Sequence, residues 1–176
     1  MDAIVEAALR KWPNVPHCYG WLALDARGDW YLRDARAQAA GAFPQVKGSR
    51  IEHRGLREFI ERNYEADARG CWYFQNGPQR VYVELQAAPW VWRLSPDAAP
   101  GCSITTHTGL AASCLEAWTD AGGRLFLHCD RGFGLVHSLD IELAAQMVDA
   151  GLWQPQPLDF AAMPERFGYV LRPQAE

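Results

Sequence analysis

Two similar eight-residue segments occur in the chain, Asp25-Ala26-Arg27-Gly28-Asp29-Trp30-Tyr31-Leu32 and Asp67-Ala68-Arg69-Gly70-Cys71-Trp72-Tyr73-Phe74. A weaker copy reads Asp120-Ala121-Gly122-Gly123-Arg124-Leu125-Phe126-Leu127. In each copy an Asp-x-x-Gly corner leads directly into an aromatic, apolar segment, which is typical of a tight turn followed by a strand. Repetition of this kind indicates a small supersecondary unit that the fold uses several times.

The segments around these corners predict two similar halves. The first half would consist of a hairpin, a helix and a strand at 19–33, 54–66 and 71–75, and the second of the same elements at 115–128, 138–150 and 167–171. Aligning Asp25 with Asp120 gives an offset of 95 residues between the halves. The sequence therefore predicts an α+β fold with two similar halves, each an antiparallel sheet packed by one helix.

The remaining chain provides a boundary and several further elements. Residues 95–102 are rich in Pro, Asp and Ala, so we expect a linker there, between an N-terminal half at 1–94 and a C-terminal half at 103–176. We also expect a helix over residues 1–10 and a loop over 34–50. Asn76-Gly77 predicts a hairpin turn, because both residues tolerate positive φ. After that turn, Val81, Val83 and Leu85 would be buried, with Tyr82, Glu84 and Gln86 on a wet face.

Composition excludes several classes of protein. The net charge of −4, with only two Lys among 176 residues, disfavours nucleic-acid binding. No apolar run approaches the roughly 20 residues of a membrane span. Residues 1–11 carry acids first and bases last, the reverse of a signal peptide, so we expect a cytoplasmic protein. The five Cys form no C-x-x-C pair, and free thiols are the expectation in that compartment.

A group of His and Cys residues in the second half suggests two kinds of chemistry. His107, His128, Cys129 and His137 could ligate a metal, and Cys129 with His107 and Asp130 could form a nucleophilic site. Neither group has the close paired spacing of a strong metal site or a local catalytic signature. The sequence therefore favours partly buried polar residues, and it predicts no metal, no cofactor and no catalytic residue.

Aromatic strands provide the better candidate for a binding site. The candidate residues are Trp72, Arg80, Tyr82, Trp90 and Trp92. An apolar groove with a few polar anchors is how small-molecule sites are built, and Arg80 could hold a carboxylate or a phosphate. The competing interpretation is that alternate aromatics fill the core while the others decorate a sheet face. A cleft between the halves near residues 95–102 is a second candidate location.

A further set of short motifs runs through the chain. It consists of Gly48-Ser49-x-Ile51, Trp72-Tyr73-Phe74, Arg80-Val81-Tyr82-Val83, Ala88-Pro89-Trp90, Arg131-Gly132 and Gly151. In these motifs, over most of residues 19–151, the chain resembles a group of uncharacterised proteobacterial proteins classed as domains of unknown function. The chain departs from that group in an insertion at 34–47 and a Pro-rich segment at 154–166. The resemblance implies an α+β fold with a repeated motif and a role in signalling or ligand sensing, and it carries over no catalytic residue.

These observations lead to one functional hypothesis and two alternatives. The first is a cytoplasmic ligand-binding or regulatory module without catalytic activity, whose partner is a small acidic metabolite or another protein. One alternative is a metal-dependent or Cys/His hydrolase built on His107, His128 and Cys129. The other is a protein-interaction scaffold that uses exposed Trp residues as anchors.

Overall fold

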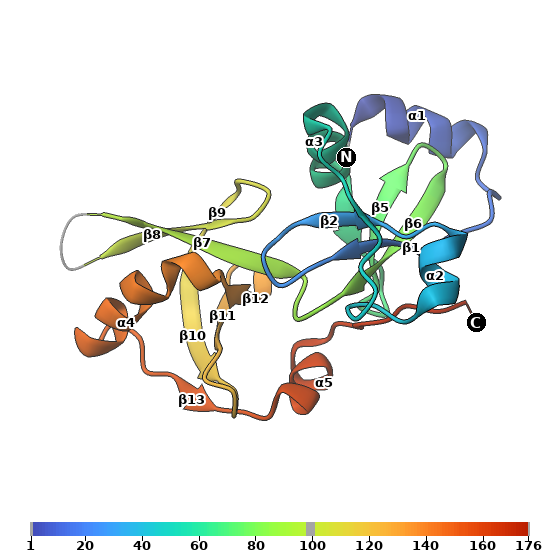
Figure 1. Ribbon diagram of the computed structural model, residues 1–176. Helices are drawn as coiled ribbons and strands as arrows, with labels where there is room; N and C mark the ends of the chain where they lie inside the picture. The colour runs from blue at the N-terminus through green and yellow to red at the C-terminus, as the bar shows by residue number, and fades with distance from the viewer. Residues whose placement is uncertain (1, 98–100, 176) are drawn as a thin grey trace. The chain divides into compact units, whose positions relative to one another are not determined.

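The computed structural model describes residues 2–97 and 101–175 and confirms the α+β fold (Figure 1). The chain divides into two compact units. Unit 1 comprises Met1–Asp25, Asp29–Gln86 and Tyr169–Glu176, and unit 2 comprises Ala26–Gly28 and Ala87–Gly168. Each unit has its own sheet.

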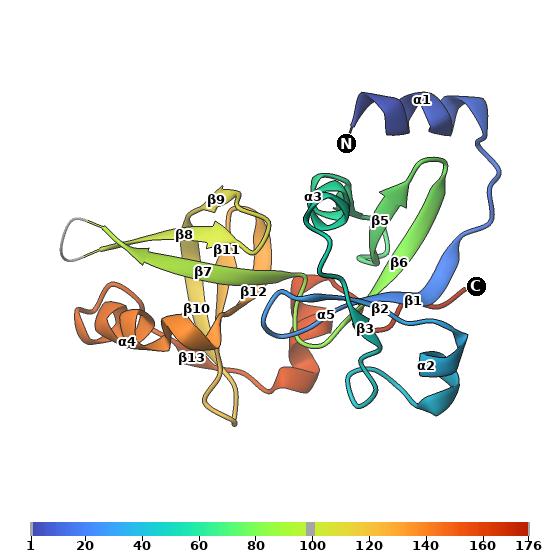
Figure 2. The same ribbon diagram turned by 45° about the horizontal axis from the view of Figure 1, so that its top comes forward.

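Unit 1 contains a six-stranded sheet in the order β3-β2-β1-β6-β5-β4. Helix α3 packs against β5 (Figures 1 and 2). The helices are α1 (Ala3–Lys11), α2 (Ala35–Ala40) and α3 (Arg54–Arg62). The strands are β1 (Cys18–Leu24), β2 (Trp30–Leu32), β3 (Ser49–Arg50), β4 (Tyr64–Ala66), β5 (Trp72–Asn76) and β6 (Gln79–Leu85).

Unit 2 contains a seven-stranded sheet in the order β13-β10-β11-β12-β7-β8-β9. Helix α4 packs against β7. The strands are β7 (Trp90–Pro96), β8 (Cys102–Thr106), β9 (Ala111–Ala112), β10 (Cys114–Thr119), β11 (Leu125–Cys129), β12 (Gly132–Val136) and β13 (Gln156–Pro157). The helical segments are η1 (Ser138–Asp140), α4 (Ile141–Asp149), η2 (Phe160–Ala162) and α5 (Met163–Phe167).

The two sheets share one strand topology. In unit 1 the first strand, β1, runs parallel to the last strand of its set, β6, with Leu22 opposite Val83. In unit 2 β7 runs parallel to β12 in the same way, with Trp90 opposite Gly134. Reading each sheet outward from this parallel pair gives β1-β2-β3 and β6-β5-β4 in unit 1, and β7-β8-β9 and β12-β11-β10 in unit 2. The halves are therefore similar, but their sheets are mixed rather than purely antiparallel.

This topology corrects the predicted alignment of the halves. The Asp120 corner joins β10 to β11, so its counterpart in unit 1 is the Asp67 corner between β4 and β5, not the Asp25 corner between β1 and β2. The helices also differ in position, since α3 precedes β4 whereas α4 follows β12. The offset of 95 residues was wrong because similar turn chemistry occurs at corners that are not equivalent.

All three corners have the same hydrogen bonds. The backbone amide of the Asp donates to the carbonyl four residues later, at 3.0 Å from Asp25 to Asp29, 3.0 Å from Asp67 to Cys71 and 3.2 Å from Asp120 to Arg124. The Asp carboxylate in turn accepts from the amide of that later residue, at 3.0, 3.0 and 2.8 Å. An Asp side chain that bonds the backbone of its own turn explains why this residue opens each copy.

Other expected elements differ from the structure. Residues 167–171 form no strand, because α5 extends to Phe167 and Gly168 ends it with a left-handed φ of 66°. The predicted helix at 54–66 ends at Arg62, and Tyr64–Ala66 instead pairs with β5. Within the expected loop at 34–50, Asp34 caps the short helix α2 by accepting from the Ala37 amide.

The predicted linker at 95–102 lies at the end of a hairpin within unit 2. Ser95 is opposite Ser103 and Pro96 is opposite Cys102, while residues 98–100 fall outside the described part of the chain. The division between the units instead follows Gln86. The Asn76-Gly77 hairpin is present, but Asn76 belongs to the ladder opposite Gln79, so the turn residues are Gly77 and Pro78.

Burial on β6 differs from the predicted alternation. Tyr82, expected on a wet face, is only 2% exposed. It packs with Cys71 and Tyr73, and Tyr19 and Val170 lie against this cluster. The C-terminal segment that carries Val170 is fixed along unit 1, since the Val170 amide donates to the Gly70 carbonyl at 3.1 Å. A segment distant in the sequence therefore covers the second face of the sheet.

The core of unit 2 is built on two tryptophans of β7. Trp92 is fully buried, and its indole N–H donates to the Leu127 carbonyl at 3.0 Å. Trp90 is 6% exposed and donates to the Arg131 carbonyl at 2.8 Å. A Cβ placed on Gly134 would lie 2.5 Å from the Trp92 Nε1 and 2.7 Å from the Trp90 carbonyl oxygen. Gly134 thus allows the two central strands of this sheet to pack around Trp92.

Candidate functional site

A cavity of about 500 Å³ in unit 1 gathers arginines and tyrosines. Residues from β1, β6, the Asp67 corner and the C-terminal segment contribute to its walls. The lining residues are His17, Tyr19, Asp67, Arg69, Arg80, Tyr82 and Ala175. Two of them, Arg80 and Tyr82, belong to the binding site predicted from the sequence.

Stacked rings form the apolar part of this cavity. The rings of Tyr19 and Tyr82 are parallel within 5°, with centroids 4.6 Å apart. The His17 ring meets the Tyr82 ring edge-on at 5.7 Å. Tyr19 and Tyr82 lie side by side because β1 and β6 are the parallel pair at the centre of the sheet. Aromatic pairs in this geometry are stable and rigid, so they provide a fixed wall.

A hydrogen-bonded network fixes the carboxylate of the cavity. Asp67 Oδ2 accepts from the Tyr82 hydroxyl at 2.9 Å and from Arg69 Nε at 3.1 Å. Burial alone would raise the pKa of Asp67, but these bonds and the one from the Cys71 amide hold it below its ordinary value. Asp67 is therefore an ionised acceptor that is already engaged by its neighbours.

The same network keeps Arg69 charged and Tyr82 neutral. Hydrogen bonds to Tyr19, Asp67 and Tyr82 raise the pKa of Arg69. Burial raises the pKa of Tyr82, and the nearby Asp67 adds to this effect. Asp67 balances the charge of Arg69, and it fixes the position of the Tyr82 hydroxyl.

Arg80 adds a second guanidinium to the cavity and belongs to the same network, because it hydrogen-bonds Tyr82 and is attracted by the Asp67 carboxylate. Its guanidinium carbon lies 4.5 Å from the centre of the Tyr73 ring, and the side chain is half-buried. Within residues 2–97 and 101–175, no carboxylate forms an ion pair with Arg80. A guanidinium that is held over an aromatic face and lines a cavity is suited to bind a carboxylate or a phosphate.

The other predicted binding residues lie elsewhere. Trp72 is on β5, where its ring contacts Tyr64 with centroids 4.6 Å apart. Trp90 and Trp92 belong to the core of unit 2 described above. Neighbouring residues of a strand point to opposite faces, so Trp72 and the Tyr73 that faces Arg80 lie on different sides of β5. The structure therefore groups Arg80 with Tyr82 and separates both from the three tryptophans.

The His and Cys candidates of unit 2 have separate partners. His107 Nδ1 accepts from the Val91 amide at 3.3 Å, and His137 Nδ1 accepts from the Leu139 amide at 3.0 Å. His128 lies 3.4 Å from Glu116, and Cys129 is buried opposite Cys114. In the described part of the chain, no three His, Cys, Asp or Glu side chains lie close enough together to hold a metal ion.

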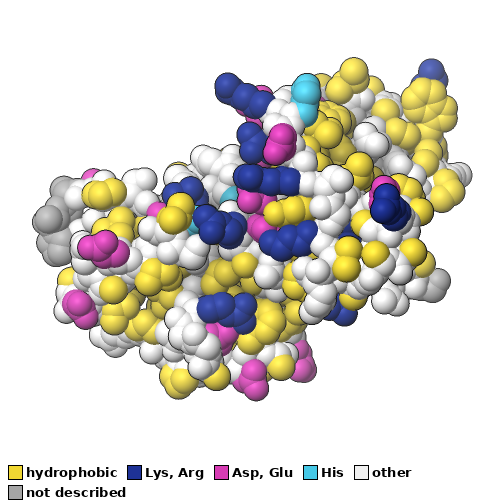
Figure 3. Space-filling view, viewed as in Figure 1, with side chains coloured by type: hydrophobic (Ala, Val, Ile, Leu, Met, Phe, Trp, Pro, Cys, Tyr) yellow, Lys and Arg dark blue, Asp and Glu magenta, His cyan; other side chains and the backbone are white. Residues whose placement is uncertain are grey.

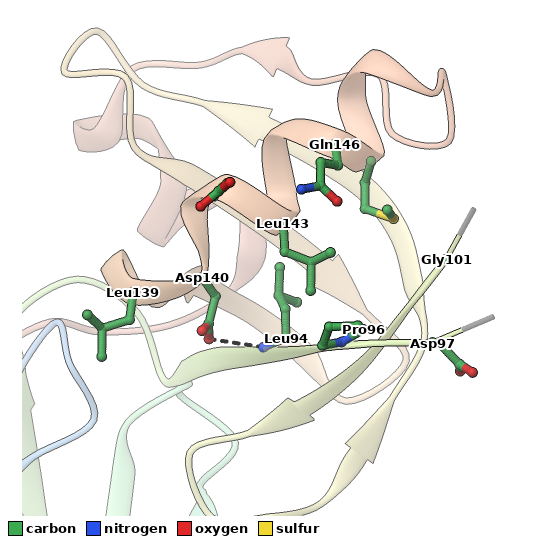
Figure 4. A pocket seen from close by; sticks show the side chains of 10 residues that line it. Leu94, Pro96, Asp97, Gly101, Leu139, Asp140, Leu143 and Gln146 are labelled. Carbon is green, nitrogen blue, oxygen red and sulfur yellow. Dashed lines mark hydrogen bonds between the residues drawn. The ribbon is translucent and has the colours of Figure 1, made fainter. Parts of the chain in front are cut away.

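A second cavity, of about 540 Å³, lies in unit 2 near the predicted location at residues 95–102 (Figure 4). Leu94, Pro96 and Leu143 form its apolar wall. Its polar end is Asp140, which accepts from the Leu94 amide at 3.0 Å and from Arg93 Nε at 2.7 Å. Asp97 and Glu142 also line this cavity, so its charged side chains are acidic, and it suits an anion less well than the cavity around Arg80 does.

Charged side chains of both signs are interspersed on the face shown in Figure 3. This distribution agrees with the modest net charge of −4. Over the described residues, none of the helices has the length and apolar character that crossing a membrane requires.

Comparison with known proteins gives a family without an assigned activity. A family model described as "Protein of unknown function (DUF2946)" matches residues 1–174. The chain belongs to this family. Two solved structures, both of DUF1285 family proteins, are similar to this chain. The protein from Silicibacter pomeroyi DSS-3 has 15% identity and a TM-score of 0.49, covering 81% of this chain and 82% of its own.

The second solved structure is a DUF1285 family protein from Shewanella baltica OS155, with 13% identity and a TM-score of 0.46, covering 72% of this chain and 91% of its own. Comparison with curated proteins finds no match.

Sequence reasoning missed five lining residues of the cavity around Arg80, namely His17, Tyr19, Asp67, Arg69 and Ala175. Asp67 and Arg69 belong to the repeated corner, which is a recognisable feature of the sequence. The repeat predicts a supersecondary unit that the fold uses several times, and it does not by itself indicate a binding site. His17 and Tyr19 reach the cavity only through the parallel pairing of β1 with β6, which joins residues about 60 positions apart.

Proposed function

We propose that the chain is a cytoplasmic ligand-binding regulatory module without catalytic activity. Its ligand is a small acidic metabolite that binds in the unit 1 cavity, with a carboxylate or phosphate on Arg80 and a flat or apolar part against the Tyr19–Tyr82 stack. A role in sensing or signalling is what the resemblance to uncharacterised proteobacterial domains implies.

The observation that supports this proposal most is the state of Arg80. It is a half-buried guanidinium that lines a cavity of about 500 Å³, and Asp67, the one carboxylate among the described residues that line this cavity, is already bound to Arg69 and Tyr82. An anion would find donors there that need little rearrangement, which lowers the entropic cost of binding.

The absence of catalysis is supported by the state of Asp67. A general base works best with a pKa near the operating pH, whereas hydrogen bonds outweigh burial and lower the pKa of Asp67. Its oxygens already accept from the Cys71 amide, Arg69 and Tyr82. These contacts suit a carboxylate that positions its neighbours.

A thermal-shift screen followed by calorimetric titration tests the proposal. The panel contains inorganic phosphate, small dicarboxylates, phosphorylated sugars, nucleotides and amino acids. A ligand at about 100 times its Kd stabilises the native state by about 2.7 kcal/mol, so at least one anion is expected to raise the Tm clearly. The neutral analogue of that ligand should leave the Tm unchanged.

Two matched variants locate the site. Arg80→Gln removes the charge from the cavity and should abolish the shift. Arg36→Gln removes an exposed charge from helix α2 of the same unit, outside the cavity, and should keep it. The proposal fails if no anion in the panel binds the wild type, or if binding persists undiminished in Arg80→Gln.

A further inference from the structure

Two cysteines of unit 2 face each other across neighbouring strands. Cys114 on β10 is directly opposite Cys129 on β11. Residues opposite each other on antiparallel strands project to the same face, so their thiols share one side of the sheet. Both are free thiols.

The hydrogen bonds of the next pair show which kind of position the cysteines occupy. The Asp130 amide donates to the Ser113 carbonyl at 3.1 Å, and the Ser113 amide donates to the Asp130 carboxylate at 2.9 Å. Only the first of these is a backbone ladder bond, because the second goes to a side chain. That ladder bond places Ser113–Asp130 at the hydrogen-bonded position and Cys114–Cys129 at the adjacent non-hydrogen-bonded one, next to the register shift between Cys114 and Glu116. At such positions the Cα atoms are about 4.5 Å apart, within the range of roughly 4.4–6.8 Å that a disulfide spans.

The two thiols differ in environment. Cys129 is buried, whereas Cys114 is half-buried and lines a cavity of about 310 Å³ together with Glu116 and Trp153. A hydrogen bond from the Cys129 thiol lowers the pKa of Cys114, and the same bond raises the pKa of Cys129. An accessible, more acidic thiol beside a second thiol is the arrangement found in peroxide-sensitive cysteine pairs.

We propose that Cys114 and Cys129 form a reversible, peroxide-sensitive disulfide. The Cys114 thiolate attacks one oxygen of hydrogen peroxide, the O–O bond breaks, and one water leaves after protonation. The Cys129 sulfur then attacks the Cys114 sulfenic acid, its S–O bond breaks, and a second water leaves. Two thiols and one peroxide thus give one disulfide and two waters, and a dithiol reductant reverses the reaction.

Thiol counting and peptide mapping on the intact wild-type chain test this site. The chain has five cysteines, so treatment with a slight excess of hydrogen peroxide should lower the number of thiols that react under denaturing conditions from five to three. Digestion should give one cross-linked peptide pair that contains Cys114 and Cys129, and dithiothreitol should restore all five thiols.

Three serine variants separate the roles of the cysteines. Cys114→Ser should lose no thiol pair at the same peroxide dose. Cys129→Ser should stop at a Cys114 sulfenic acid that dimedone traps. Cys102→Ser is the matched control, because Cys102 is a half-buried thiol of the same unit whose pKa is raised by burial and by the nearby Cys114. It should still form the wild-type cross-link.

Peptide mapping of the wild-type chain tests the proposal even if one of the serine variants does not fold. It is overturned if peroxide gives no intramolecular disulfide, or if the cross-linked pair contains Cys102, Cys18 or Cys71. It is also overturned if Cys114→Ser, shown to be folded by its far-UV circular dichroism spectrum, loses a thiol pair as fast as the wild type.

Discussion

Units 1 and 2 share a strand order but use their aromatic side chains differently. In unit 1 Tyr19 and Tyr82 stack at the edge of an open cavity, where Arg69 and Arg80 also lie. In unit 2 Trp90 and Trp92 both come from β7, the counterpart of β1, and fill the core. The same scaffold thus supports a binding surface in one copy and a packed interior in the other.

The equivalent corners place their arginines against different aromatic rings. Asp120 binds Arg124 through a carboxylate oxygen at 2.7 Å, and Asp67 binds Arg69 at 3.1 Å. In unit 2 the guanidinium of Arg124 lies 4.4 Å from the ring of Phe160 in segment η2. At the Asp67 corner, the guanidinium of Arg69 lies 5.6 Å from the ring of Tyr82, and both residues line the cavity. The two arginine side chains are equally exposed, at 39% and 38%, so the ring that each one meets is what distinguishes the corners.

The largest expected effect concerns the core of unit 2. Trp92→Ala should lower the free energy of unfolding by about 3–5 kcal/mol, because it removes a fully buried ring and leaves a cavity. Trp21→Ala in unit 1 is the control, since Trp21 is 40% exposed and its loss should cost about 1 kcal/mol or less. Urea unfolding measures both variants. If both variants lowered the free energy of unfolding by the same amount, the distinction between a packed unit 2 and an open unit 1 would be contradicted.

Gly134→Ala should have the next largest effect. The added Cβ would meet the Trp92 Nε1 at 2.5 Å and the Trp90 carbonyl oxygen at 2.7 Å, and the backbone atom cannot move aside cheaply. We expect a loss of about 1–3 kcal/mol, as for other overpacked cores. Gly122→Ala is matched, because its Cβ would meet nothing closer than the Asp120 Oδ1 at 3.4 Å. In thermal unfolding, the Tm of Gly122→Ala should lie close to that of the wild type.

Much of this architecture could be predicted from local sequence. The corners opened by Asp25, Asp67 and Asp120 were expected as turns, and each is one, because an Asp side chain that bonds its own backbone needs no distant partner. The hairpin that follows Asn76 was also predictable from local sequence, because Gly77 readily adopts the positive φ of 57° that its turn requires. The α+β class followed from the alternation of these hairpins with helically spaced apolar residues.

Features that depend on distant contacts could not be predicted. The burial of Tyr82 depends on Val170, which comes from a segment almost 90 residues later. The pairing of β1 with β6 brings His17 and Tyr19 to the cavity, and no local pattern encodes that parallel register. Arg80 and Tyr82 were found because both occur on one strand beside a recognisable turn, whereas Trp90 and Trp92 share their aromatic pattern but fill a core.

The corner carboxylates give a smaller, pH-dependent effect. Hydrogen bonds outweigh burial and lower the pKa of both Asp67 and Asp120 in the folded state. Their contribution to stability is therefore present above the unfolded pKa of about 3.9, and it is lost as the pH falls through the lower folded pKa. Asp67→Asn and Asp120→Asn should each cost about 1–2 kcal/mol near neutral pH, and less in acid.

Urea unfolding across a pH series measures this effect. A cost of Asp67→Asn that stays constant or grows in acid would contradict the assigned role of the ionised carboxylate. The pair also sharpens the comparison between the units, because only Asp67→Asn removes a carboxylate from the unit 1 cavity and should change anion binding there.

An amide chemical-shift titration of the intact protein tests the central claim most directly. A binding anion is added to the ¹⁵N-labelled chain while both units are observed together. The account predicts perturbations that saturate at His17, Tyr19, Arg69, Arg80 and Tyr82, and that leave the Arg124 and Phe160 amides of unit 2 unchanged. Perturbations centred on Arg124 and Phe160, or a saturating response that spares Arg80 and Tyr82, would contradict it.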